Sequence, residues 1–379
     1  MTRLLKLALL LALVLTSLTP ATGAAAQGSN PRALPALRDH YIVTLKAGER
    51  PGGLLSAHGI RASFVYDKVL NGFAAHLTLG QLAALQRSGA VERIEADRPV
   101  TLAQPGVAAV PSWGLDRINQ NYLPLNGNGS FAHTASNVNA YIIDTGIQTN
   151  LAEFGGRAAV AYDALGGNGQ DCQGSGTFNA GIVGGSTFGV AKGVRLWAVR
   201  VLNCQGSGSI AQVVAGLNWV AANHRPNAVA LVSVGGSFSA AMNTAVKNMI
   251  NSGVATAAVA GSSGGDACNF SPSSVTEAIV AAASNSSDQR APFNNTGTCI
   301  DLYAPGVSIT SITPTGPQAR SGTTMAAAHV AGVAALYKAV YGDQPSATVH
   351  NWIINVATPN VIINNVLPTP NRLLYSAGL

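Results

Sequence analysis

One apolar segment, Ala228–Val234, constrains the fold of this chain more than any other feature. The segment is apolar except for Ser233 and holds three valines, as expected of a strand that is covered on both faces. A helix with a serine N-cap is predicted over Ser239–Ser252, and the pattern of Val254–Ala260 indicates the next strand. Strands that alternate with helices predict a parallel sheet with right-handed crossovers and helices on both faces, which is an α/β fold.

The alternation continues on both sides of that segment. Asn139–Ile143 is predicted to form a short strand that ends at Asp144. Ser209–Asn223 carries apolar residues at helical spacing, and Thr324–Tyr341 is predicted to form a long helix. Because functional residues of parallel sheets collect at the carboxyl ends of the strands, Asp144 is a candidate site residue.

A smaller unit of mixed elements precedes the α/β part of the chain. Its predicted strands are Tyr41–Leu45, Gly72–Leu77 and Val91–Ile94. A helix is predicted over Thr78–Ser88, with Thr78 as its N-cap. Strands and helices mixed within residues 41–99 indicate an α+β mini-domain.

The N-terminus has the three parts of a secretory signal peptide. Arg3 and Lys6 precede the apolar run Leu7–Leu15, and small residues follow as far as Ala26. The apolar run is too short to span a bilayer, and a short membrane anchor is the alternative interpretation. The rest of the sequence has no run of about 18 uncharged apolar residues, so we expect a soluble, secreted product.

Composition excludes some classes of function. The chain is 47% hydrophobic and only 10% charged, as in a globular protein with a sizeable core. Most of the net charge of +6 lies before residue 105, so the main domain is nearly neutral and has no basic run that would bind nucleic acid. We expect a monomer.

Four cysteines lie after residue 170, and they are Cys172, Cys204, Cys268 and Cys299. In an exported chain an even number of cysteines predicts two disulfides, and their spacing alone leaves three connectivities. No two of them form a C-x-x-C pair, which disfavours a zinc site.

One run near the end of the chain, Ser321–Gly332, has the sequence SGTTMAAAHVAG. This run is similar to the nucleophile motif S-G-T-S-M-A-x-P-H-V-A-G of the subtilisin-like serine proteases, in particular the proteinase K-like and aqualysin-like members. The other matching segments include Trp113–Ile118, Val199–Gly208 and Asp301–Gly306. The resemblance covers essentially the whole chain and implies a subtilisin-like three-layer α/β fold with a mostly parallel sheet.

The same resemblance implies how the chain is divided. Residues 1–26 would be the signal peptide, 27–104 an inhibitor I9-like propeptide with its linker, and 105–379 the subtilase domain. In this family the propeptide folds beside the protease and plugs its groove, so the chain's own propeptide is an expected partner. The disulfide pairs that the resemblance implies are Cys172–Cys204 and Cys268–Cys299.

The catalytic residues of the family come in the chain order aspartate, histidine, serine. Asp144 matches the aspartate, but Ser175 stands where the family has its histidine, and Thr324 stands where it has its serine. Ser262 replaces the asparagine whose amide stabilises the oxyanion. A serine hydroxyl near neutral pH cannot accept a proton as an imidazole does.

These changes predict a secreted subtilase homologue that has lost efficient catalysis, a pseudoprotease. Phe178 replaces a second histidine of the same motif, and His329 matches a histidine that the family keeps for packing. The alternative is an active serine-type endopeptidase with an atypical nucleophile and base.

Two glycine-containing segments resemble the backbone that pairs with extended substrates in the family. The candidate substrate-binding residues are Ser207, Gly208, Ser233 and Gly235. Recognition of this kind adds a strand through main-chain hydrogen bonds and needs no catalytic triad, so extended peptides are the expected ligands. The alternative is that these segments are only turns.

A structural calcium ion is also implied by the resemblance. Asp301 matches a calcium-binding carboxylate, helped in the family by carbonyl groups at the positions of Thr276 and Ala278. An ordinary surface aspartate is the alternative. A second family calcium site, near Asp116, is weakened in this sequence.

Overall fold

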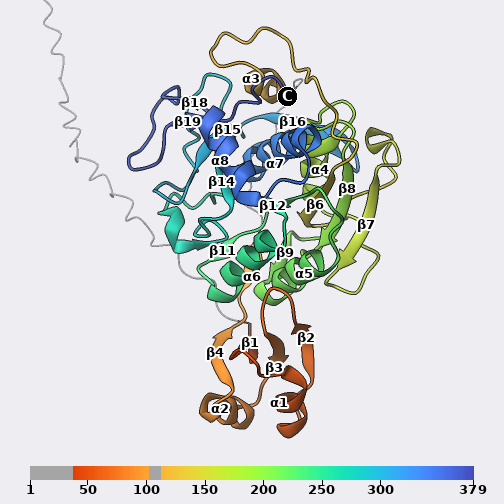
Figure 1. The fold of residues 1–379 in the computed structure, drawn as a ribbon, viewed down its shortest axis with the longest axis vertical. Coiled ribbons are helices and arrows are strands. Elements are labelled where there is room, and N and C mark those ends of the chain that lie inside the picture. The colour runs from red at the N-terminus through yellow and green to blue at the C-terminus, as the bar shows by residue number, and fades with distance from the viewer. Residues whose placement is uncertain (1–36, 102–111) are drawn as a thin grey trace, which may run out of the picture. The chain divides into compact units, whose positions relative to one another are not determined.

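The computed structural model describes residues 37–101 and 112–379 (Figure 1). The predicted signal peptide, residues 1–26, and most of the predicted linker lie outside these ranges. The described residues form a small α+β part and a large α/β part, each organised around its own sheet. Within the described ranges, no helix combines the length and the hydropathy needed to cross a membrane.

The small part is a four-stranded antiparallel sheet with the order β2-β3-β1-β4. Its elements are β1 (His40–Leu45), α1 (Pro51–Ala57), β2 (Ala62–Tyr66), β3 (Gly72–His76), α2 (Leu79–Arg87), β4 (Val91–Ala96) and the following β5 (Pro99–Thr101). Both helices pack leucines, Leu54 and Leu82, against a core that includes Val43, Phe73 and Leu85.

The helix α2 begins where the sequence predicts it. Thr78 and Gln81 form a capping box, in which Gln81 N–H donates to Thr78 Oγ1 at 3.2 Å and Thr78 N–H donates to Gln81 Oε1 at 3.0 Å. The sequence pattern did not predict α1 or β2. No residue of α1 is fully buried, and its sequence, PGGLLSA, is too short to show the apolar periodicity by which a helix is recognised.

The large part is built on a nine-stranded sheet with the order β18-β19-β15-β14-β12-β10-β6-β8-β7. In chain order the strands are β6 (Asn139–Asp144), β7 (Ala158–Asp163), β8 (Arg195–Arg200), β10 (Ala228–Val232), β12 (Ala255–Val259), β14 (Ile279–Ser284), β15 (Leu302–Pro305), β18 (Thr358–Pro359) and β19 (Arg372–Leu373). All neighbours run parallel except β18 and β19. The predicted mostly parallel sheet is confirmed.

Helices cover both faces of this sheet (Figure 1). The helices are α3 (Trp113–Ile118), α4 (Ser175–Gly184), α5 (Ile210–Asn223), α6 (Ala240–Asn251), α7 (Thr323–Tyr341) and α8 (Ser346–Val356). Successive residues of a strand point to opposite faces. Accordingly, Ile142 of β6 belongs to a core shared with α4 and α7, whereas Ile143 belongs to a core shared with α5 and α6.

Shorter elements join the main ones at the surface. They are η1 (Ala152–Phe154), β9 (Ser207–Ser209), β11 (Gly236–Ser237), η2 (Ala267–Asn269), β13 (Phe270–Ser271), β16 (Ile309–Thr313) and β17 (Gly316–Arg320). Two disulfides, Cys172–Cys204 and Cys268–Cys299, have the pairing that the resemblance implied. The first of them ties the loop before α4 to the loop before β9.

The strand predicted over Ala228–Val234 ends early, at Val232. Ser233 lies just beyond it, where its hydroxyl donates to the carboxylate of Asp144 and lies 2.9 Å from Ile143 O. Ser233, the polar residue that interrupts the apolar run, therefore bonds to Asp144 at the carboxyl end of β6.

Candidate active site

Asp144 is the last residue of β6 and is fully buried. Its Oδ1 accepts the N–H of Thr145 at 2.7 Å. Its Oδ2 accepts Asn179 Nδ2 at 2.8 Å, Ser175 Oγ at 3.2 Å and the hydroxyl of Ser233. The carboxylate is therefore surrounded by neutral donors, and no imidazole of the described residues bonds to it.

Ser175, at the position of the family's histidine, is the first residue of α4 and is fully buried. The turn that leads into α4 is held by the carboxylate of Asp171, which accepts the N–H groups of Gly174 at 2.8 Å and Thr177 at 2.9 Å. The backbone frame at this position is thus well ordered by hydrogen bonds. A short hydroxyl, rather than an imidazole, projects from it toward Asp144.

Asn179 is a site residue that the sequence interpretation missed. It lies one helical turn after Ser175, is fully buried, and donates from Nδ2 to Asp144 Oδ2. The same amide lies 3.4 Å from Ser175 Oγ. A signal was present in the sequence, because the histidine motif of the family has valine where this chain has Asn179.

Burial raises the pKa of the Asp144 carboxyl to about 6. Hydrogen bonds from Ser233, Asn179 and the backbone of Thr145 oppose this rise, and the charge of Asp171 adds to it. The group that would orient a catalytic histidine is therefore easier to protonate than an ordinary aspartate.

The sequence interpretation named Phe178 but missed Arg320, which lies beside it. Phe178, at the position of the family's second histidine, is fully buried, and the guanidinium of Arg320 lies over its ring, 5.2 Å from the centroid. Arg320 comes from β17, and burial lowers its pKa while the charges of Asp171 and Asp144 raise it. The charges of two carboxylates therefore act on this guanidinium, and a guanidinium cannot act as a base.

Thr324, at the nucleophile position, is fully buried near the start of α7. Its Oγ1 donates to the sulfur of Met325 at 3.4 Å, a weak acceptor. None of the histidines in the described ranges bonds to Thr324. His329 is fully buried, its Nδ1–H donates to Met325 O at 2.8 Å, and burial lowers its pKa to about 4. His329 is thus a neutral packing residue.

Ser262 stands at the oxyanion position, in the loop after β12. Its hydroxyl is buried and has no hydrogen-bond partner among the described residues. The loop itself is held by Asn295, whose Oδ1 accepts Ser263 N–H at 2.9 Å and whose Nδ2 donates to Ala260 O at 2.9 Å. The loop is well supported, although the amide donor that the family uses is replaced by a shorter hydroxyl.

The predicted substrate groove contains β5 (Pro99–Thr101), the strand that follows the small part and is called the tail below. β5 pairs with β9 antiparallel, with Val100 opposite Gly208 and Thr101 opposite Ser207. On the other side, Thr101 N–H donates to Gly235 O at 3.4 Å. The tail therefore lies as a strand between the two segments that the sequence singled out, and these segments are more than turns. The Ser233 side chain contacts Asp144 rather than the tail.

Two acidic residues before β5 anchor the small part to helix N-termini of the large part. Glu95 accepts the hydroxyl of Ser239 and the N–H of Ala241 at 3.4 Å, at the start of α6. Asp97 Oδ1 accepts the N–H of Ala211 at 3.0 Å, at the start of α5. Negative charge is stabilised at these helix ends by the partial positive charge of the free amides.

The proposed calcium carboxylate has other partners. Asp301 Oδ2 accepts Val280 N–H at 2.8 Å, and Asp301 Oδ1 lies 3.4 Å from His350 Nε2. No cluster of three or more histidine, cysteine, aspartate or glutamate residues suited to a metal occurs in the described ranges. Asp301 would have to bind calcium mainly with carbonyl groups and water, so the fit to a strong calcium site is poor.

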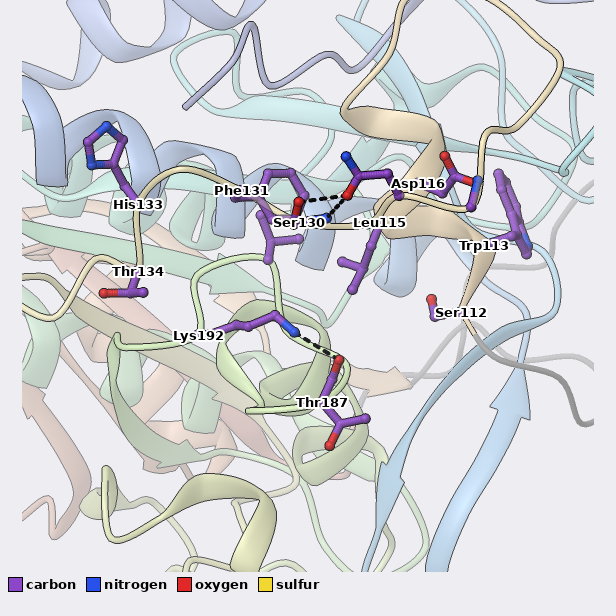
Figure 2. A pocket seen from close by; sticks show the side chains of 14 residues that line it. Ser112, Trp113, Leu115, Asp116, Ser130, Phe131, His133, Thr134, Thr187 and Lys192 are labelled. Atoms are coloured by element: carbon purple, nitrogen blue, oxygen red, sulfur yellow. Dashed lines mark hydrogen bonds between the residues drawn. The ribbon is translucent and has the colours of Figure 1, made fainter.

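A cavity of about 620 Å³ lies beside α3, close to the second family calcium position (Figure 2). The carboxylate of Asp116 accepts the N–H groups of Gly127 at 2.8 Å and Asn126 at 3.3 Å. Lys192, on the far wall, donates to the carbonyls of Ser186 and Thr187. The charged groups of this cavity are therefore already satisfied by the backbone.

Comparison with known proteins gives consistent matches over both parts. A model of the subtilase family matches residues 136–374, and a model of peptidase inhibitor I9 matches residues 54–103. The extracellular serine proteinase of a Thermus species is 45% identical over 92% of this chain and 87% of its own length. Proteinase R of Parengyodontium album is 35% identical over 98% of this chain and 99% of its own length.

A solved structure gives the same result. The crystal structure of a cold adapted subtilisin-like serine proteinase aligns with a TM-score of 0.68 and 43% identity, covering 70% of this chain and 97% of that chain. The likeness therefore extends over nearly all of the solved chain.

Proposed function

The chain belongs to the subtilase family, and we propose that it is a secreted member that has lost efficient catalysis and binds extended peptide segments in its groove. The observation that carries this proposal is the bonding of Asp144. Its carboxylate accepts hydrogen bonds from Ser175, Asn179 and Ser233. The hydroxyl of Ser175 and the amide of Asn179 thus occupy the place of the histidine that accepts the proton in the family mechanism.

The known effects of removing catalytic residues favour a complete loss of turnover over a modest reduction. In subtilisin, removal of either the nucleophile or the base alone lowers turnover by about 2 × 10⁶-fold. Here the base position is Ser175, the nucleophile position is Thr324, and the oxyanion donor is Ser262. Among the described residues, the buried Thr324 hydroxyl bonds to a methionine sulfur and to no group that could remove its proton.

Peptide binding rests on a different set of atoms. The tail residues Val100 and Thr101 pair with the backbone of Gly208, Ser207 and Gly235, and none of these contacts uses the lost chemical groups. Because strand addition depends on main-chain hydrogen bonds, another extended segment of a peptide or protein can take the place of the tail. The product names of the relatives, such as extracellular serine proteinase, support an extracellular location.

The second candidate is an active endopeptidase. It is favoured by Thr324, because this residue keeps a hydroxyl near the N-terminus of a buried helix in the family position. It would need a base that the described residues do not place beside that hydroxyl.

A serine-reactive phosphonate probe and a sensitive fluorogenic peptide assay separate the two candidates. We expect no phosphonate adduct on Thr324 and no peptide turnover above that of a Thr324→Ala variant. Turnover that is abolished by Thr324→Ala would refute the loss of catalysis. Binding of an uncleaved extended peptide, measured by fluorescence anisotropy, tests the other half of the proposal.

A further inference from the structure

A serine, a histidine and an aspartate lie in line at one end of the small sheet, far in sequence from the family's catalytic positions. Ser63 Oγ lies 3.0 Å from His40 Nε2, and His40 Nδ1 lies 2.9 Å from Asp97 Oδ2. A carboxylate can only accept a hydrogen bond, so Nδ1 carries the proton in the neutral imidazole. His40 Nε2 is then the acceptor for the Ser63 hydroxyl, which is the arrangement that activates a serine nucleophile.

The fold of the small part brings these residues together by a β-bulge. β3 separates β2 from β1 in the sheet, so Ser63 and His40 are not on neighbouring strands. In the pairing of β2 with β3, Ala62 faces Ala75 and Phe64 faces Ala74, which leaves Ser63 as the extra residue of the bulge. Bulges redirect a side chain, and they are frequent beside active sites.

The base and its orienting carboxylate are fixed from several sides. Asp97 is fully buried, its N–H donates to His40 O at 2.9 Å, and its Oδ1 accepts Ala211 N–H. The ring of His76 packs edge-on against the ring of His40, with the centroids 4.6 Å apart. His40 is therefore held with Nε2 toward Ser63, and only Ser63 of the three is exposed.

A cavity opens beside the nucleophile. It has a volume of about 620 Å³ and is lined by Ser63 and His40, the apolar side chains of Leu37, Phe64 and Leu165, and the cationic side chain of Arg38. Small-molecule sites commonly measure about 300–1,000 Å³. The apolar lining suits an acyl chain or an aromatic alcohol, and Arg38 is the charged group available to an oxyanion.

We propose that Ser63, His40 and Asp97 form a hydrolytic site for small carboxylic esters. Ser63 Oγ attacks the ester carbonyl carbon while its proton passes to His40 Nε2, and Asp97 stabilises the imidazolium. The bond from the carbonyl carbon to the alcohol oxygen breaks, and the alcohol leaves with the proton held by His40. A water molecule, deprotonated by His40, then attacks acyl-Ser63, releases the carboxylic acid and restores the serine hydroxyl.

The first test uses the full chain and a fluorophosphonate probe. We expect a phosphonyl adduct on Ser63, identified by peptide mapping with mass spectrometry, and no adduct on the exposed Ser56 of the same domain. Failure of the folded chain to form an adduct on Ser63 overturns the proposal. An adduct on Thr324 instead would contradict the loss of protease catalysis, so the two proposals fail by different results.

The second test measures hydrolysis of p-nitrophenyl butyrate. We expect Ser63→Ala to abolish hydrolysis, and His40→Gln to lower the rate by roughly 10²-fold or more. The matched variant Ser56→Ala should hydrolyse the ester like the unaltered chain. Equal hydrolysis by Ser63→Ala and the unaltered chain overturns the proposal, provided that thermal melting shows both to be folded.

Discussion

Ser175 Oγ lies 3.2 Å from Asp144 Oδ2 and donates a hydrogen bond to it. In a working triad the aspartate orients an imidazole and stabilises its charged form. In this protein the same carboxylate orients a serine hydroxyl and the Asn179 amide. The backbone around Asp144 and Ser175 is therefore still ordered by hydrogen bonds, but none of the described side chains bonded to Asp144 can accept a proton.

Restoring the histidine alone should not restore peptidase activity. In Ser175→His, the Asn179 amide would still bond to the carboxylate that the new imidazole needs. The nucleophile and oxyanion positions would still hold Thr324 and Ser262 instead of the family's serine and asparagine. We expect Ser175→His to show no turnover of a chromogenic peptide. Combination of Ser175→His with Asn179→Val, Thr324→Ser and Ser262→Asn should give measurable turnover.

The control for this restoration is Asp144→Ala in the combined variant. It should return turnover to background, because the new imidazole would lose its orienting carboxylate. Activity of the single Ser175→His variant equal to that of the combined variant would show that Asn179 is not an obstacle.

The pH dependence of stability should reveal the buried carboxyl of Asp144. Its folded pKa of about 6 is above the unfolded value near 3.9, so the folded state binds the proton more tightly. Its contribution is greatest below the unfolded pKa and is lost as the pH rises to about 6, by roughly 3 kcal/mol. Asp144→Asn removes this change, so its free energy of unfolding relative to the unaltered chain should rise over this range and then stay constant.

Urea unfolding from pH 4 to pH 8 measures that difference. Asp67→Asn serves as the control, because the Asp67 side chain is 69% exposed. A flat difference between Asp144→Asn and the unaltered chain across pH 4–6 would mean that Asp144 titrates as an ordinary aspartate.

His329 should change the pH dependence of stability in the direction opposite to Asp144. Its folded pKa of about 4 is below the usual value near 6.5, so the unfolded state binds more protons between these values. Stability is fully present above about pH 6.5 and falls by roughly 3 kcal/mol as the pH drops to about 4. His329→Gln, whose amide can still donate to Met325 O, should lose this acid sensitivity in the same urea experiments. Unchanged acid sensitivity would contradict the buried, neutral state of His329.

The tail should bind the groove less tightly when its anchor is weakened. Glu95 accepts hydrogen bonds at the start of α6, and such a charge at a helix N-terminus contributes about 0.3–1 kcal/mol. Glu95→Gln should therefore strengthen the binding of an added extended peptide by about two- to fivefold, as measured by fluorescence anisotropy. Glu92→Gln, on the exposed side of the same strand, should leave the peptide affinity unchanged.

Calcium should stabilise the protein only weakly. Asp301 already accepts an N–H and faces His350, so we expect micromolar calcium to leave the melting temperature unchanged and millimolar calcium to raise it slightly. Asp301→Asn should abolish the rise. A large stabilisation by micromolar calcium would show that Thr276 and Ala278 complete a stronger site than these contacts indicate.

The sequence predicted the fold well where periodicity and capping act locally. The strand over Asn139–Ile143 and the helices that begin at Thr78, Ser209 and Ser239 lie close to their predicted bounds, because each is defined by its own apolar pattern and cap. The disulfide pairs needed the family resemblance, since spacing alone left three connectivities.

The parts of the site that were missed depend on contacts between distant segments. Arg320 reaches Phe178 of α4 from the β16–β17 hairpin, and His40 meets Ser63 across an intervening strand because of a bulge. Neither contact follows from any local pattern of residues. Asn179 differs, because its departure from the family motif was visible in the sequence.

The strand pairing of β5 with β9 also sets how a second ligand could bind. A tail joined to the same chain competes for the groove at an effective concentration in the millimolar range, as for a short tether. A free peptide with micromolar intrinsic affinity would then occupy few of the grooves until the tail detaches. The molecule that controls ligand access would be whatever removes or cuts the tail, so an external protease could switch a closed protein into an open receptor.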